Sequence, residues 1–151
     1  MVAWQVPRVR ILKRMSTYRS IPEHSPSYFP SLGVPDGQTA LGIYENTPNS
    51  ILDCVVITNQ ALCVDRGDRL EEIRFDDMAS VTWAPRDKQE ANSLEIRMRD
   101  RSVKYVPVRR RFGPGGKYGD VFEFVRFVDR SISDFRLLQA ERDGLSPRNG
   151  R

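Results

Sequence analysis

The chain has 151 residues, of which 39% are hydrophobic and 29% charged, and its net charge is +4. This length suits one domain, which buries roughly 68 to 70% of the surface that the unfolded chain exposes. The composition excludes a wholly disordered chain. No stretch approaches the roughly 18 consecutive apolar residues of a membrane span, and arginines interrupt the opening MVAWQVPRVRILKR. We therefore expect a folded domain without a signal peptide or a membrane anchor.

Basic residues concentrate in two stretches of the chain. Residues 1–20 carry five basic groups and no acid, and residues 93–119 carry eight basic groups against two acids. Because the whole chain carries only +4, the remainder is net acidic, with a run of acids between Asp65 and Asp77. This polarity favours an anionic partner, either a protein or an anionic surface. Ordinary solvated surface charge is the simpler alternative.

The first 39 residues read as a basic segment followed by a Pro-rich connector. Residues 3–19 fit neither a strand period nor a helix period better, so a strand and a short basic helix both stay open. Residues 20–39 hold four of the ten prolines, which argues against regular structure. The apolar side chains of Tyr28, Phe29 and Leu32 predict that the connector packs on the domain that follows.

Seven short strands are expected between residues 40 and 108, because runs rich in Val, Ile, Leu and aromatic residues alternate with turn residues. The runs are 40–46, 53–59, 61–67, 69–75, 78–84, 93–99 and 103–108. In the sixth run, Leu94, Ile96 and Met98 alternate with charged residues, which is typical of a strand with one buried face. Pro107 fits an edge strand, since proline has no N–H to give to a neighbouring strand.

The second and third runs read as a hairpin, because only a tight turn at Asn59 and Gln60 separates them. This register sets Cys54 and Cys63 diagonally on one face. Their Cα atoms then lie farther apart than the roughly 7 Å limit of a disulfide. We therefore expect two free, buried thiols and a reducing, cytoplasmic compartment.

One amphipathic helix is expected from about residue 120 to residue 141, after the Gly-rich stretch FGPGGKYG. Asp120 is a suitable N-cap. Apolar residues recur at steps of three and four, which predicts that one stripe, including Phe124, Val128 and Ile132, packs on the sheet. Residues 142–151 carry the Gly and Pro signals that end a helix, and a disordered tail is expected there.

Two passages carry a resemblance to a known family. VVITNQALCV (55–64) has the form strand, Thr-Asn turn and strand, and IRFDDMASV (73–81) has the form strand, acidic turn and strand. With the order of seven strands and one helix, they resemble the pleckstrin-homology-like superfold, in its bacterial and GRAM-type versions, over residues 40 to about 134. The resemblance implies an α+β fold: a seven-stranded, bent antiparallel sheet or half-open barrel, capped by one C-terminal helix.

The resemblance implies a non-catalytic platform for lipid headgroups, peptides or protein partners, without cofactors or catalytic residues. Phosphoinositide-binding relatives gather basic side chains in their first hairpin loop. Here that loop, ENTPNSILD, has no Lys or Arg. We therefore do not expect phosphoinositide binding of the usual kind.

The residues themselves give one candidate site for a protein partner or an anionic surface, a basic patch near the last strands. Its members are Arg97, Arg99, Arg109, Arg110, Arg111 and Lys117. The three consecutive arginines precede a Gly-rich loop, and alternation along a strand cannot bury three guanidinium groups in a row, so we expect them to be exposed.

An enzyme is the main alternative to a binding module. His24 is the only histidine and lies in the Pro-rich connector, so no Ser-His or Cys-His pair can be argued without it. The spacing of the cysteines and the histidine fits no zinc motif. An uncharacterised hydrolase stays open. Nucleic-acid binding is disfavoured, because few aromatic residues lie among the arginines. The oligomeric state, including a homo-oligomer, also stays open.

Overall fold

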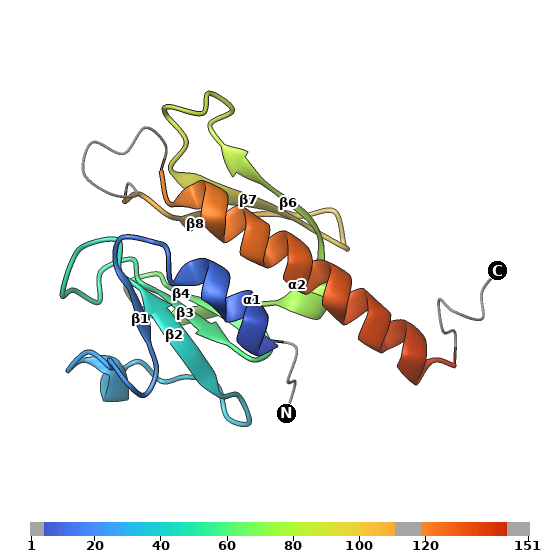
Figure 1. Cartoon of the computed structure of the whole chain (residues 1–151), viewed down its shortest axis with the longest axis horizontal. Helices are drawn as coiled ribbons and strands as arrows, with labels where there is room; N and C mark the ends of the chain where they lie inside the picture. The colour runs from blue at the N-terminus through green and yellow to red at the C-terminus, as the bar shows by residue number, and fades with distance from the viewer. Residues whose placement is uncertain (1–4, 111–118, 145–151) are drawn as a thin grey trace.

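Two antiparallel sheets and two α-helices make up the α+β fold of the computed structural model, which describes residues 5–110 and 119–144 (Figure 1). The elements in chain order are α1 (Gln5–Leu12), β1 (Tyr18–Ser20), the 3-10 helix η1 (Phe29–Ser31), β2 (Ala40–Tyr44), β3 (Val55–Thr58), β4 (Ala61–Asp65), β5 (Leu70–Arg74), the 3-10 helix η2 (Phe75–Asp77), β6 (Met78–Ala84), β7 (Ser93–Met98), β8 (Val103–Pro107) and α2 (Val121–Arg142). One sheet has the order β1-β2-β3-β4-β5 and the other the order β6-β7-β8.

Each of the seven runs that the sequence marks as strands contains a strand, from β2 to β8. Of the two arrangements expected from the sequence, a single seven-stranded sheet is wrong for the part of the chain that the structure describes, and the half-open barrel stays a prediction. β1 adds an eighth strand, and the strands divide into two open sheets. The division falls at η2, which redirects the chain between β5 and β6, so that these two strands belong to different sheets.

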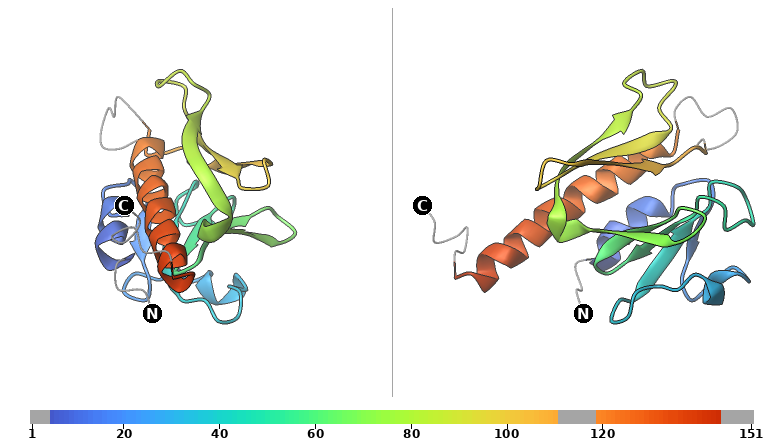
Figure 2. Two further views of the ribbon diagram at one scale, coloured as in Figure 1. Left: turned by 90° about the vertical axis from the view of Figure 1, so that its right-hand side faces the viewer. Right: turned by 180° about the vertical axis from the view of Figure 1, so that it is seen from behind.

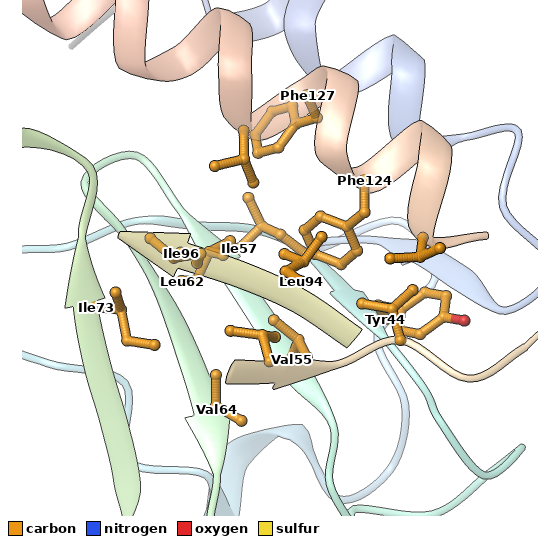
Figure 3. Packing of buried hydrophobic residues seen from close by; sticks show 14 of the residues in the cluster. Tyr44, Val55, Ile57, Leu62, Val64, Ile73, Leu94, Ile96, Phe124 and Phe127 are labelled. Carbon is orange, nitrogen blue, oxygen red and sulfur yellow. The ribbon is translucent and has the colours of Figure 1, made fainter. Parts of the chain in front are cut away.

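The β3–β4 hairpin has the register expected from its two-residue loop. Val55 pairs with Val64 and Ile57 pairs with Leu62, and all four side chains lie in the main core (Figure 3). Cys63 pairs with Val56, two residues from Cys54, so the cysteines are diagonal neighbours on the opposite face. They are buried there in a smaller cluster with Leu32, Ile43, Val56 and Ala61. Both are free thiols, as predicted.

We expect both thiols to resist alkylation in the folded protein. Burial raises the pKa of Cys54 and that of Cys63 to about 12. The thiolate, which is the reactive form, is therefore scarce at neutral pH. Intact-mass analysis after iodoacetamide treatment should show no adduct on native protein and two adducts in denaturant. Rapid labelling of the native protein would contradict the burial of these residues.

The helix α2 closes the space between the sheets. It lies between the three-stranded sheet on one side and α1 on the other, and its C-terminal end extends beyond both sheets (Figures 1 and 2). Its buried stripe includes Phe124, Val128 and Ile132, as the sequence predicts. The ring of Phe124 lies edge-on to that of Tyr44, with 5.8 Å between centroids. The α2 helix thus supplies the aromatic centre of the core.

The described part of residues 1–39 shares this core. Both alternatives left open for residues 3–19 occur, because a helix forms over Gln5–Leu12 and a strand begins at Tyr18. The last turn of the helix buries Ile11 and Leu12 in the main cluster. After α1, the strand β1 pairs with β2. The connector is held by Tyr28, whose hydroxyl donates to the buried Glu45 carboxylate over 2.7 Å. At the other end of the chain, residues 145–151 of the expected tail lie outside the described residues.

Asp120 takes the N-cap position of α2, but its side chain does not bond to the helix. Its Oδ2 accepts hydrogen bonds from the Ser16 N–H and from the Tyr44 hydroxyl, each over 3.0 Å. Its Oδ1 accepts from Ser16 Oγ over 3.2 Å. Tyr44 Oη in turn accepts from the Arg110 N–H over 3.0 Å. The carboxylate therefore joins α2 to the N-terminal segment and to β2. Asp120 is the N-cap residue, as predicted, but donors outside the helix take its side-chain oxygens.

Candidate interaction surfaces

The basic patch expected from the sequence is divided by the fold. Arg97 and Arg99 lie at the end of β7, whereas Arg109 and Arg110 follow β8. Pro107 pairs with Ser93, four residues before Arg97. At about 3.3 Å per residue, the two pairs of arginines therefore lie more than about 13 Å apart along the sheet. Arg111 and Lys117 lie outside the described residues.

Arg109 and Arg110 both bond to other residues of the chain. Arg109 is exposed, but its Nη2 forms an ion pair with Asp53 Oδ2 over 2.9 Å. Its backbone N–H donates to Asn46 Oδ1 over 2.8 Å. Arg110 is half-buried, which corrects the expected exposure of this residue. The backbone N–H of Arg110 donates to the hydroxyl of the buried Tyr44 over 3.0 Å, which holds this residue against the core.

A groove of about 540 Å³ lies between η2, the start of β6 and the C-terminal half of α2. Its apolar lining consists of Phe75, Met78, Ala79, Ile132, Phe135 and Ala140. Phe75 and Phe135 stack at 5.5 Å between ring centroids, which forms part of the floor. The helix α2 continues past the ends of the sheets (Figure 2), and its C-terminal half borders the groove together with η2 and the start of β6.

Two arginines from different elements line this groove, Arg99 after β7 and Arg136 on α2. Arg99 Nη1 donates to the carbonyl oxygen of Asp76 over 3.2 Å, and Arg136 Nη2 donates to that of Ala79. Because Asp76 and Ala79 are three residues apart, both guanidinium groups reach the same short backbone segment. Within residues 5–110 and 119–144, neither arginine forms an ion pair. Their charges are therefore open to an external carboxylate.

The groove also has two acidic side chains. The Asp76 carboxylate is already paired with Arg74, with 3.3 Å between Oδ1 and Nε. Asp143 lies at the far end of α2, where its carboxylate accepts from Gln139 over 3.3 Å. The charge around the groove is therefore mixed, with the unpaired positive groups near η2.

A second cavity, of about 440 Å³, lies on the other side of Arg99 near the turn between β7 and β8. Its other basic side chains are paired, because Lys104 lies 2.8 Å from Glu71 and Arg74 lies 3.3 Å from Glu72. Burial opposes ionisation of Glu71, but hydrogen bonds from Lys104 and Arg66 outweigh it and lower the pKa of Glu71. The charged side chains around this second cavity thus form an internal ion-pair network. The first groove, whose arginines form no ion pair in the described residues, is the better candidate site.

The single histidine lines a third cavity, of about 360 Å³, with Ser16, Thr17 and Glu45. Ser16 Oγ donates to Asp120, and Thr17 Oγ1 donates to the carbonyl oxygen of Glu45. In the described ranges, no group of three or more His, Cys, Asp or Glu side chains could hold a metal ion. Over the same ranges, no helix has the length and apolar character needed to cross a bilayer.

Comparisons with known proteins give no relative from which a site could be transferred. No protein-family model matches the chain, and no curated protein or solved structure matches it either. The functional argument therefore depends on the geometry of the surfaces described above.

Sequence reasoning identified Arg99 but missed Arg136 and the apolar groove beside it. The signal that could have found them is length. A helix of 22 residues spans about 33 Å at 1.5 Å per residue. A strand of five to seven residues spans only roughly 17 to 23 Å. The end of such a helix extends beyond the strands, so its C-terminal half is only partly covered by them, and Phe135 and Arg136 line the groove beside the start of β6.

Proposed function

We propose that this chain is a non-catalytic interaction module that binds an acidic segment of a partner protein in the groove between η2, β6 and α2. The observation that carries the proposal is the position of Arg99 and Arg136 on the walls of an apolar groove. Arginine binds carboxylates through strong, charge-assisted hydrogen bonds. Apolar side chains buried in a pocket at the centre of an interface supply most of its affinity.

A protein segment fits this groove better than a flat anionic surface does. The groove is concave, and both arginines line it with exposed side chains. Asp76 and Asp143 at its rim would repel a uniformly negative bilayer. An extended segment can instead place one bulky apolar side chain on the floor and a neighbouring carboxylate near η2.

The architecture of the module is proposed to be pleckstrin-homology-like. The four antiparallel strands β2 to β5, the three strands β6 to β8 and the C-terminal helix α2 follow one another in the order of that superfold. On this proposal α1 and β1 are additions at the N-terminal end. The two free thiols support a reducing, cytoplasmic location for the module.

The test is a binding titration with fluorescent peptides in which one Phe or Leu is flanked by Glu. We expect Arg99→Ala and Arg136→Ala each to weaken binding roughly tenfold, because a hydrogen bond to a charged group contributes about 1.5 to 3 kcal/mol. Fluorescence anisotropy measures the dissociation constants, and binding should also weaken as salt is added.

Arg130→Ala is the matched control, since Arg130 is exposed on the same helix and does not line the groove. This variant should bind as wild type does. A peptide with Lys in place of Glu should bind poorly. Equal binding of all variants, or no binding of any Glu-flanked peptide, would rule out the proposed ligand chemistry.

A further inference from the structure

The outward face of the three-stranded sheet carries two exposed apolar side chains beside one charge of each sign. Val103 and Tyr105 of β8 are 38% and 53% exposed. Glu95 and Arg97 lie next to them on the central strand β7. In the part of the chain that the structure describes, neither of these two side chains forms an ion pair. Exposed apolar side chains next to unpaired charges favour an interaction surface.

The strand register arranges this face in two rows that run across β6, β7 and β8. The first row consists of Thr82, Glu95 and Tyr105, and the second row consists of Ser80, Arg97 and Val103. Neighbours within a row are about 4.8 Å apart, and the rows are about 6.7 Å apart along the strands. Each row therefore has a polar residue, a charged residue and an apolar residue in the same order.

This order makes the face complementary to itself. Consider a twofold axis that lies above this face, parallel to the sheet and perpendicular to its strands, midway between the two rows. Rotation about this axis places the first row of one copy opposite the second row of the other copy. Glu95 then faces Arg97 of the second copy, and Tyr105 faces Val103. On β6, Thr82 faces Ser80. One rotation satisfies all three strands, as an isologous interface requires.

We propose that the chain forms a twofold-symmetric dimer by packing these two faces together. Sheets that pack face to face lie about 10 Å apart, a distance that opposed Glu and Arg side chains can span.

Pairing of two copies through the free edge of β8 is disfavoured. The carbonyl oxygen of Tyr105 accepts from Arg66 Nη2 over 2.9 Å, and that of Pro107 accepts from Asn46 Nδ2 over 2.8 Å. Pro107 also has no N–H to donate.

The size of the face sets the expected strength of the dimer. A three-stranded face with short strands is smaller than the roughly 800 Å² per partner that stable complexes bury. The dimer should therefore be weak and should depend on protein concentration. It does not use the groove between η2, β6 and α2, so the dimer and the peptide-binding proposal can fail independently.

Sedimentation equilibrium of the full chain over a range of concentrations tests the dimer. Glu95→Arg and Arg97→Glu each place like charges opposite one another at two symmetric positions. Each should raise the dissociation constant roughly tenfold or more. The double variant Glu95→Arg/Arg97→Glu should dimerise again, because the exchange restores both opposite-charge pairs. An equimolar mixture of the two single variants should also form dimers, since one copy then carries two positive charges on this face and the other two negative charges.

Asp129→Arg and Arg130→Glu are matched controls, because they change exposed charges on α2. They should leave the dissociation constant unchanged, and thermal melts of every variant report whether it folds. A wild-type chain that stays monomeric at all concentrations overturns the proposal. So does a dimer that neither single variant weakens, or a mixture of the two single variants that stays monomeric.

Discussion

Replacing Phe124 with Ala is expected to lower the free energy of unfolding by roughly 3 to 5 kcal/mol. Phe124 has no exposed surface, and its ring centroid lies 5.8 Å from that of Tyr44 and 6.4 Å from that of Phe127. Figure 3 shows its ring pointing from α2 into the core. Removing the ring leaves a cavity between α2 and β2 that the rigid sheet cannot close. Denaturant titration followed by circular dichroism measures the loss.

Leu137→Ala is the matched control for this experiment. Leu137 lies on the same helix but is 49% exposed. Its truncation should therefore cost less than about 1 kcal/mol. A loss below about 1 kcal/mol for Phe124→Ala as well would mean that this stripe of α2 does not pack on the sheets.

Replacing Asp120 with Ala is expected to cost roughly 2 to 4 kcal/mol. The change removes the acceptor of the Tyr44 hydroxyl and of the Ser16 backbone N–H. Tyr44 has no exposed surface, so water cannot replace the lost partner without a rearrangement. Asp120→Asn should cost much less. The amide oxygen can accept the same two bonds, and the amide nitrogen can donate to Ser16 Oγ.

The free energy of unfolding is expected to depend on pH differently in the wild type and in Asp120→Asn. Burial raises the pKa of Asp120 above its ordinary value of 3.8, despite the opposing hydrogen bonds from Ser16 and Tyr44 and the nearby charge of Arg110. The folded state then binds more protons than the unfolded state between these two pKa values. The stability contributed by Asp120 is thus largest below 3.8 and falls as the pH rises through the folded pKa.

Asp120→Asn lacks this titration. Its unfolding free energy relative to wild type should therefore increase as the pH rises across the same window. Denaturant titrations of both proteins at several pH values measure the difference. A relative stability that decreases with pH would show that the pKa is lowered in the folded state instead.

The strand positions could be predicted because each is a local pattern. Leu94, Ile96 and Met98 alternate with polar residues, and that alternation alone defines β7 and its buried face. The three residues of β1 are too short a run to show any period. The division into two sheets could not be predicted, because it depends on where distant strand edges meet after the turn at Phe75–Asp77.

The candidate site could be predicted only in part, because it too depends on contacts between residues far apart in the sequence. Arg99 stood out as a charged residue at the end of an alternating strand. Its neighbour in the groove, Arg136, lies in a different element, and only the packing of α2 brings the two together. The ion pair between Arg109 and Asp53 joins residues far apart in the chain, so the sequence could not show that this arginine is already engaged.

The meeting of the first helix with the last has a consequence for synthesis on the ribosome. Arg8 bonds to Asp134, 126 positions away, and Ser16 bonds to Asp120, 104 positions away. Translation proceeds at about 5 to 20 residues per second, so Ile11 and Leu12 emerge several seconds before α2, the helix on which α1 packs. A nascent chain of this protein therefore leaves these two apolar side chains without their helical partner until α2 has emerged and α1 can pack on it.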